Sequence, residues 1–112
     1  MLVFNRFVVS QDSAGGIDAF VERAHAALEA LAARPGYVRG ELTRSLDEPA
    51  SWCLLTEWEN VGTYRRALGA FDVKVTATPL LAESLFEPTA YETLAAAAPG
   101  GKVEVKSSDR AV

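Results

Sequence analysis

A stretch of closely spaced apolar side chains from Trp52 to Trp58 is the strongest structural signal in this chain. Its density of aromatic and aliphatic residues is typical of a buried strand. Both sides of the strand are mostly apolar, although an antiparallel sheet in a small protein usually leaves one side to water. We therefore expect a second copy of the chain to cover the side that the helices leave open. One side carries Trp52, Leu54, Thr56 and Trp58, and the other carries Cys53, Leu55 and Glu57.

Two helices are predicted from apolar residues that recur every three or four positions. The first spans Ile17–Ala33 and ends there, because Pro35 disfavours helix at the preceding residue and Gly36 permits a turn. The second spans Val61–Leu68, directly after the central strand, where the side chain of Asn60 can cap its first turn.

Three more strands complete the predicted sheet. They span Leu2–Ser10, Tyr37–Leu46 and Thr89–Leu94, the last as a core strand, and a turn at residues 47–50 joins the second of them to the central strand. The resulting order β-α-β-β-α-β is the split βαβ pattern of ferredoxin-like folds. We therefore predict an α+β fold with one antiparallel sheet and the helices on one face.

Residues 71–78 fit two structures. Phe71, Val73, Val75 and Ala77 alternate with other residues, which favours a strand. Phe71 and Val75 are also four positions apart, which fits a helix. The pattern alone prefers the strand.

The folded domain is expected to span residues 1–94, and a tail is expected from 95 to 112. Residues 95–101 form a low-complexity spacer. The alternation in Lys102–Lys106 is compatible with a marginal edge strand, and the residues after it are typical of a chain terminus.

Charge and composition exclude several classes of protein. The net charge is −4 and no basic cluster occurs, so a nucleic-acid partner is not expected. One histidine and one cysteine, Cys53, cannot build a zinc site or an internal disulfide by themselves. The sequence shows no signal peptide and no apolar run long enough to span a membrane. We therefore expect a soluble cytoplasmic protein without a membrane partner or a bound metal.

The remaining candidate chemistry is a set of aromatic and amide side chains, whose flat walls suit a planar organic ligand. The residues alone favour a simpler interpretation, in which these rings belong to the core and the dimer interface. His25 lies at the margin of the apolar stripe of the first helix, where a partly exposed, hydrogen-bonded histidine is more common than a catalytic one. The set contains Asn5, Trp52, Trp58 and Tyr64, and it extends to Tyr37 and Tyr91.

Three short motifs carry a resemblance to a known family: Arg23-Ala24-His25, Arg34-Pro35-Gly36-Tyr37-Val38, and Leu55-Thr56-Glu57-Trp58-Glu59-Asn60 leading to Tyr64. They resemble the antibiotic biosynthesis monooxygenase domain family, which forms dimeric α+β barrels of ferredoxin-like topology. The resemblance extends over about residues 2–94. It implies that two subunits pack sheet on sheet to close a barrel. It also implies that residues 71–78 are helical, against the alternation.

The resemblance further implies a function. Members of the family often oxidise reduced polycyclic phenols to quinones with molecular oxygen and without a metal or flavin. Their pocket contains a Trp and a Tyr six positions apart, a spacing that Trp58 and Tyr64 match, whereas the Asn that precedes the Trp is replaced here by Leu54. We therefore expect a homodimeric, cofactor-independent monooxygenase of a reduced aromatic or quinol-type molecule. Its expected catalytic residues are Asn5, Trp58 and Tyr64, and its expected substrate-binding residues are Phe7, Phe20, His25 and Leu68.

Two other functions stay open. The chain can instead be a non-catalytic dimeric domain that binds an apolar ligand or acts in a stress response, because the candidate site contains no strong base. A second branch of the family binds and degrades heme, and its first-strand Asn matches Asn5. The Trp and the iron-binding His of that branch would fall near Ala67 and Ala77, so heme binding is less expected.

Overall fold

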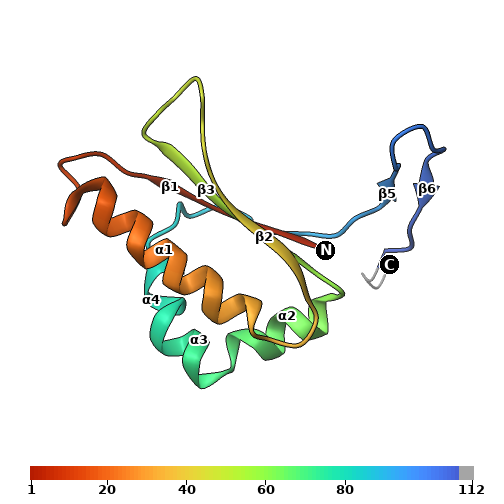
Figure 1. The fold of residues 1–112 in the computed structure, drawn as a ribbon. Coiled ribbons are helices and arrows are strands. Elements are labelled where there is room, and N and C mark those ends of the chain that lie inside the picture. The colour runs from red at the N-terminus through yellow and green to blue at the C-terminus, as the bar shows by residue number, and fades with distance from the viewer. Residues whose placement is uncertain (109–112) are drawn as a thin grey trace.

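The computed structural model describes residues 1–108 and has two layers, a four-stranded antiparallel sheet and a group of helices that cover one of its faces (Figure 1). The strands are β1 (Leu2–Val8), β2 (Tyr37–Arg44), β3 (Ser51–Trp58) and β4 (Ala90–Tyr91). They lie in the order β2-β3-β1-β4, so the predicted central strand is in the interior of the sheet. This arrangement confirms the predicted α+β fold of ferredoxin-like topology.

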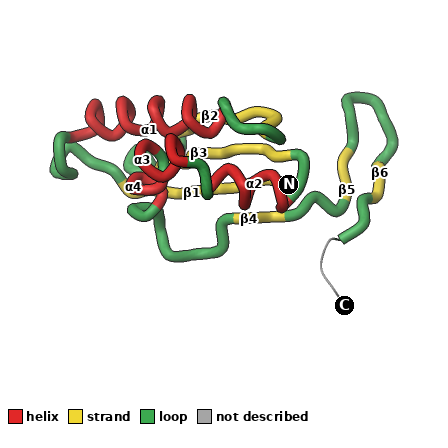
Figure 2. Tube along the Cα trace, turned by 90° about the horizontal axis from the view of Figure 1, so that it is seen from below, coloured by secondary structure: helices red, strands yellow, loops and turns green. Residues whose placement is uncertain are grey.

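The helices form a single layer on one side of the sheet (Figure 2). The first two begin and end within one residue of their predicted limits. The side-chain oxygen of Asn60 accepts a hydrogen bond from the Thr63 backbone N–H at 2.9 Å, as expected of a cap. The helices are α1 (Gly16–Ala32), α2 (Val61–Leu68), α3 (Phe71–Thr76) and α4 (Thr78–Leu81).

The register of the sheet decides which side chains face the helices. Asn5 of β1 lies opposite Leu54 of β3, and Leu54 lies opposite Leu42 of β2. Because directly opposed residues of antiparallel strands project from the same side, these three side chains share one face. Alternation along β3 places Trp58 on that face too, and Trp58 is buried in the single chain. The Trp58 side of β3 therefore faces the helices.

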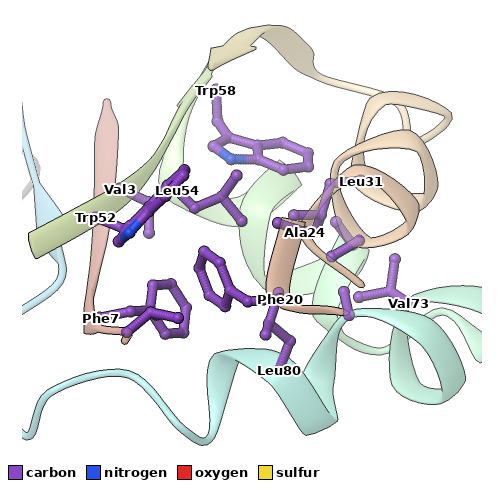
Figure 3. Packing of buried hydrophobic residues seen from close by; sticks show 14 residues of the cluster. Val3, Phe7, Phe20, Ala24, Leu31, Trp52, Leu54, Trp58, Val73 and Leu80 are labelled. Carbon is purple, nitrogen blue, oxygen red and sulfur yellow. The ribbon is translucent and has the colours of Figure 1, made fainter. Parts of the chain in front are cut away.

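The core lies between the sheet and the helices and is built largely from β3, β1 and α1 (Figure 3). Trp58 and Leu54 are each only 1% exposed. Phe20 of α1 meets Phe7 and Trp52 edge-on, with ring centroids 5.1 and 5.5 Å apart. Burial of one such side chain stabilises the fold by about 1.5–3 kcal/mol. The helices therefore hold this face of the sheet without help from a second chain.

No helix within residues 1–108 covers the opposite face of the sheet (Figure 2). Phe4, Cys53 and Leu55 are half-buried there. The Arg6 guanidinium pairs with the Glu87 carboxylate at 2.9 Å beside them. This face thus combines a half-exposed apolar centre with paired charges.

Residues 71–76 are helical, as the family resemblance implies, and the strand favoured by alternation is wrong. Val73 and Ala77, four positions apart, are fully buried. Phe71 and Val75, also four apart, are 78% and 59% exposed. Residues four apart share one face of a helix, so the alternation reflects a buried face and an exposed face of α3.

The last part of the described chain differs most from the prediction. The expected core strand at residues 89–94 shortens to β4, whose two residues are exposed at the edge of the sheet. Its two residues, Ala90 and Tyr91, pair with Val3 and Leu2 of β1. Before β4, Pro88 has no backbone N–H, so it cannot donate a hydrogen bond that would lengthen the strand in that direction.

The expected edge strand in the tail does not join the main sheet. Instead β5 (Ala95–Ala96) and β6 (Glu104–Val105) pair with each other in a hairpin that stands apart from the domain (Figure 1). The radius of gyration is accordingly 15.2 Å, above the roughly 13 Å typical of a compact domain of this length.

Gly36 marks a close approach between the end of α1 and the start of α2. Its φ is +88°, and a Cβ atom at this position would collide with Thr63. Gly36→Ala should lower the free energy of unfolding by about 2–4 kcal/mol, because the left-handed conformation and the overpacking each cost about 1–3 kcal/mol. Urea denaturation measures this change. Gly69→Ala, where φ is −84°, is the control and should change stability by less than about 1 kcal/mol. Equal losses for both variants would contradict this account.

Candidate functional site

The site begins at the corner where β3 runs into α2. Asn60 receives the Thr63 N–H, and the Thr63 hydroxyl donates back to the Asn60 carbonyl oxygen at 2.9 Å. These two hydrogen bonds fix the first turn of α2 relative to the end of β3. Tyr64 is the next residue of that turn, so its direction is set by the same contacts.

Trp58 lies behind Tyr64 rather than in open space. Its ring centroid is 5.5 Å from that of Tyr64 on one side and 5.5 Å from that of Tyr37 on another. The indole N–H donates to the Thr56 hydroxyl at 2.9 Å. This N–H is therefore already engaged, and Trp58 is only 1% exposed. Trp58 supports Tyr64 from behind.

A cavity of about 610 Å³ opens next to Tyr64, between the helix-facing side of β1 and the helices α2, α3 and α4. This volume is in the range of pockets that hold a small organic molecule. Most of its surface is apolar, although four of its seven lining residues carry a polar side-chain group. The lining residues are Asn5, Tyr64, Leu68, Lys74, Thr78, Leu81 and Ala82.

Asn5 is the polar group that β1 contributes to this cavity, and it is only 7% exposed. Its side-chain N–H donates to the Ser84 hydroxyl at 3.4 Å, and that hydroxyl donates to the Leu81 carbonyl oxygen at 2.7 Å. Within residues 1–108 the Asn5 side chain makes no other hydrogen bond. Its amide therefore keeps hydrogen-bonding capacity for a ligand.

Tyr64 is the only residue of the expected catalytic set that can exchange a proton and also lines the cavity. Burial raises the pKa of its phenol, because a phenolate loses hydration in an apolar surrounding. At neutral pH the group is therefore a neutral hydroxyl that can donate a hydrogen bond. It is not a pre-formed base.

The structure brings together some of the sequence-predicted residues and separates others. Asn5, Tyr64 and Leu68 line the same cavity, with Trp58 one layer behind. Phe7 and Phe20 are core residues that border a different hollow, of about 90 Å³. His25 is exposed on α1 and is not among the residues that line either space.

The sequence analysis missed the wall that α3 and α4 contribute. Lys74, Thr78 and Leu81 line the cavity from these helices, and Ala82 follows them. Lys74 belongs to α3 and Thr78 to α4, so no single helical repeat in the sequence marks this wall.

A second hollow, of about 380 Å³, adjoins the first, since Tyr64 and Leu68 line both spaces. Arg65 and Tyr91 are among its other lining residues.

Residues 1–108 contain no group of three or more His, Cys, Asp or Glu side chains arranged to hold a metal ion. Over the same range no helix combines the length and the apolar character that crossing a membrane requires.

The fold and the cavity define a class of protein, an α+β domain of ferredoxin-like topology with an aromatic-backed cavity between its sheet and its helices. The antibiotic biosynthesis monooxygenase family matches residues 2–76. The chain belongs to this family, and membership supports a monooxygenase-type function.

Solved structures agree with this assignment. SnoaB, a cofactor-independent oxygenase from Streptomyces nogalater, is 31% identical over 83% of this chain and 94% of that chain, with a TM-score of 0.63. A conserved protein from Methanosarcina mazei Go1 is 20% identical over 80% and 84% of the two chains, with a TM-score of 0.63. Rv0793 from Mycobacterium tuberculosis is 16% identical over 98% and 97%, with a TM-score of 0.61. The last two show the fold alone. No curated protein matches the sequence.

The buried phenol of Tyr64 should give the protein a measurable pH dependence. Its pKa is higher in the folded chain than the value of about 10 in an unfolded one. Its contribution to stability is therefore complete below about pH 10 and is lost as the pH rises through the folded pKa. Urea denaturation should show a decline above about pH 10 that is shallower in Tyr64→Phe. Tyr37→Phe should have a smaller effect, because Arg39 opposes the burial that raises the pKa of Tyr37. An unchanged slope in Tyr64→Phe would contradict the assignment.

Proposed function

We propose that this protein is a cofactor-independent monooxygenase that oxidises a reduced aromatic or quinol-type molecule with O2. One observation carries the proposal: Asn5 and Tyr64 reach one mostly apolar cavity of about 610 Å³ from opposite layers of the fold. Trp58 holds the Tyr64 ring from behind. The similarity to SnoaB, described as a cofactor-independent oxygenase, supports the same reaction class.

The proposed reaction needs no cofactor: the substrate reacts with O2, and water accepts the first proton. An anthrone-type substrate loses a proton to water and becomes an anion. The anion passes one electron to O2, and the resulting radical and superoxide combine to form a C–O bond. The peroxide takes up a proton and the carbon loses its remaining hydrogen as a proton. The O–O bond then breaks, so that one oxygen atom stays as a carbonyl and the other leaves as water.

The cavity residues supply the polar contacts for this sequence. The Asn5 amide and the neutral Tyr64 hydroxyl donate hydrogen bonds to the oxygen on which negative charge develops. Tyr64 then gives its proton to the peroxide and recovers one from water. The apolar side chains of the lining, among them Leu68 and Leu81, pack against the ring system of the substrate. No His, Asp or Glu is among the described lining residues, so the substrate must be acidic enough to ionise without a strong base.

Replacing Tyr64 tests this role with minimal disturbance. Tyr64→Phe should lower kcat by about 10²–10⁴-fold with little change in KM, because one proton donor is lost and the ring stays in contact with Trp58. Oxygen uptake with anthrone, in the presence of a metal chelator, measures the rate. Tyr37→Phe is the matched control, since Tyr37 also packs on Trp58 but does not line the cavity. It should retain most of the wild-type rate.

The result also separates the two leading functions. If the wild-type protein does not accelerate oxygen uptake with any of a panel of hydroquinones and anthrones, the proposed oxygenase function is refuted. Tight binding of the same molecules without uptake would then identify a non-catalytic binding domain. Equal rates in wild type and Tyr64→Phe would refute the site assignment.

We also propose that the functional unit is a homodimer that buries the helix-free face of the sheet. Leu55 lies at the half-buried centre of this face, where a second copy would remove it from water. Stable interfaces of this kind bury more than about 2,000 Å² in total.

A charge at the centre of that face should prevent association. Leu55→Arg is expected to convert the dimer to monomer in sedimentation experiments, because a buried unpaired charge costs several kcal/mol. Val75→Arg is the control, since Val75 is exposed in the helix layer. It should leave the assembly intact. A wild-type chain that sediments as a folded monomer at micromolar concentration would contradict the proposal.

A further inference from the structure

The Ser84 hydroxyl contacts the Asn5 amide, although Ser84 is not among the residues that line the 610 Å³ cavity. Ser84 lies three residues after the end of α4 and is half-buried. Asn5 donates to this hydroxyl at 3.4 Å, and the hydroxyl donates to the Leu81 carbonyl oxygen at 2.7 Å. Any effect of Ser84 on a ligand in the cavity therefore passes through Asn5.

The position of this hydroxyl is fixed by contacts on both sides of it in the chain. The Ser84 backbone N–H donates to the same carbonyl oxygen of α4 at 3.1 Å. Before it, the Glu83 carboxylate pairs with Arg23 of α1. After it, the Leu85 N–H donates to the Arg6 carbonyl oxygen of β1 at 2.8 Å. The hydroxyl is thus held between α1, α4 and β1 before any ligand arrives.

The direction of the hydroxyl proton determines which end of the Asn5 amide faces Ser84. The 2.7 Å distance to Leu81 is typical of an O–H···O bond, whereas the 3.4 Å to the amide is long, so the proton goes to Leu81. The hydroxyl oxygen can then only accept, and only the N–H end of the amide can donate to it. A reversed amide would place two oxygens together without a proton between them. Within residues 1–108, the other N–H and the carbonyl oxygen of Asn5 make no hydrogen bond.

We propose that Ser84 is a positioning residue that holds the Asn5 amide in one orientation, so that a ligand always meets the same N–H and the same carbonyl oxygen. The inference rests on the proposed function, because it takes Asn5 to be a donor to the oxygen on which negative charge develops. A fixed amide offers this donor without reorganisation during the reaction. An amide that turned over freely would present its carbonyl oxygen to the developing charge for part of the time.

Nuclear magnetic resonance of the Asn5 side chain tests the orientation without turnover. Its amide signals are identified by their absence in Asn5→Ala. Exchange of these protons with water should become about two- to fivefold faster in Ser84→Ala, the change expected on loss of one long hydrogen bond. Ser84→Thr retains the hydroxyl and should exchange at nearly the wild-type rate. Ser45→Ala is the matched control, because it removes a hydroxyl that accepts bonds in the turn after β2, and it should leave the exchange unchanged.

Oxygen uptake with anthrone tests the effect on the reaction. Ser84→Ala should lower kcat by about two- to fivefold with little change in KM, because the amide is needed most where charge develops. The same substitution in an Asn5→Ala background should have no further effect, since the positioned group is absent. Ser84→Cys, whose sulfur accepts hydrogen bonds weakly, replaces Ser84→Ala if the latter does not give a native circular dichroism spectrum.

Unchanged exchange of the Asn5 amide protons in Ser84→Ala would overturn the inference. An equal loss of kcat in both backgrounds would overturn it as well, because the hydroxyl would then only stabilise the end of α4. The proposed function fails separately. If the exchange depends on Ser84 but no reduced aromatic consumes oxygen, the orientation of the amide stands and the reaction is wrong. If oxygen uptake depends on Tyr64 and Ser84→Ala keeps the wild-type kcat, the reaction stands and the role of Ser84 is wrong.

Discussion

Trp58 is held between the rings of Tyr37 and Tyr64 at the point where β3 turns into α2. The rest of the site depends on this contact, because it connects the most buried strand of the sheet to the residue that faces the cavity. The indole N–H is bonded within β3, so the ring has one defined position. The Asn60 cap fixes the first turn of α2 independently. Together these contacts hold the Tyr64 hydroxyl in place before any ligand arrives.

The opposite wall of the cavity follows from the burial of α3 and α4. Val73, Ala77 and Leu80 are almost completely buried and anchor these short helices against the core. Lys74 of α3 and Thr78 of α4 lie outside that buried face and line the cavity. The same packing that stabilises the helix layer therefore decides which polar groups a ligand meets.

Much of the fold could be predicted because its signals are local. The density of apolar side chains around Trp58 marks β3, and Asn60 marks the start of α2 within one residue. The strand that alternation alone favours at residues 71–78 is wrong, whereas the helix that the family resemblance implies is correct, because four alternating apolar residues also describe a helix with one buried and one exposed face. The length of β4 could not be predicted either, since it is a matter of pairing with a distant strand: only Ala90 and Tyr91 pair with β1.

The site was harder to predict than the fold, because contact with a cavity is a tertiary property. Alternation along β1 correctly places Asn5 on the buried side, but it places Phe7 there as well. The packing of the helices decides that Asn5 lines the cavity and that Phe7 belongs to the core. The spacing of Trp58 and Tyr64 indicates that they are close in space. It does not reveal that the indole N–H is already bonded to Thr56. Lys74 lies in the ambiguous segment, where no local pattern distinguishes it from an ordinary surface lysine.

We propose that the cavity beside Tyr64 holds a reduced aromatic molecule while an oxygen atom of O2 is transferred to its reactive carbon. Incubation of the protein with anthrone under ¹⁸O2, followed by mass spectrometry of the quinone product, tests this claim most directly. The account predicts one ¹⁸O atom in the new carbonyl group, formed much faster with wild type than with Tyr64→Phe or without protein. Labelled product that forms at the same rate with and without the protein would contradict it.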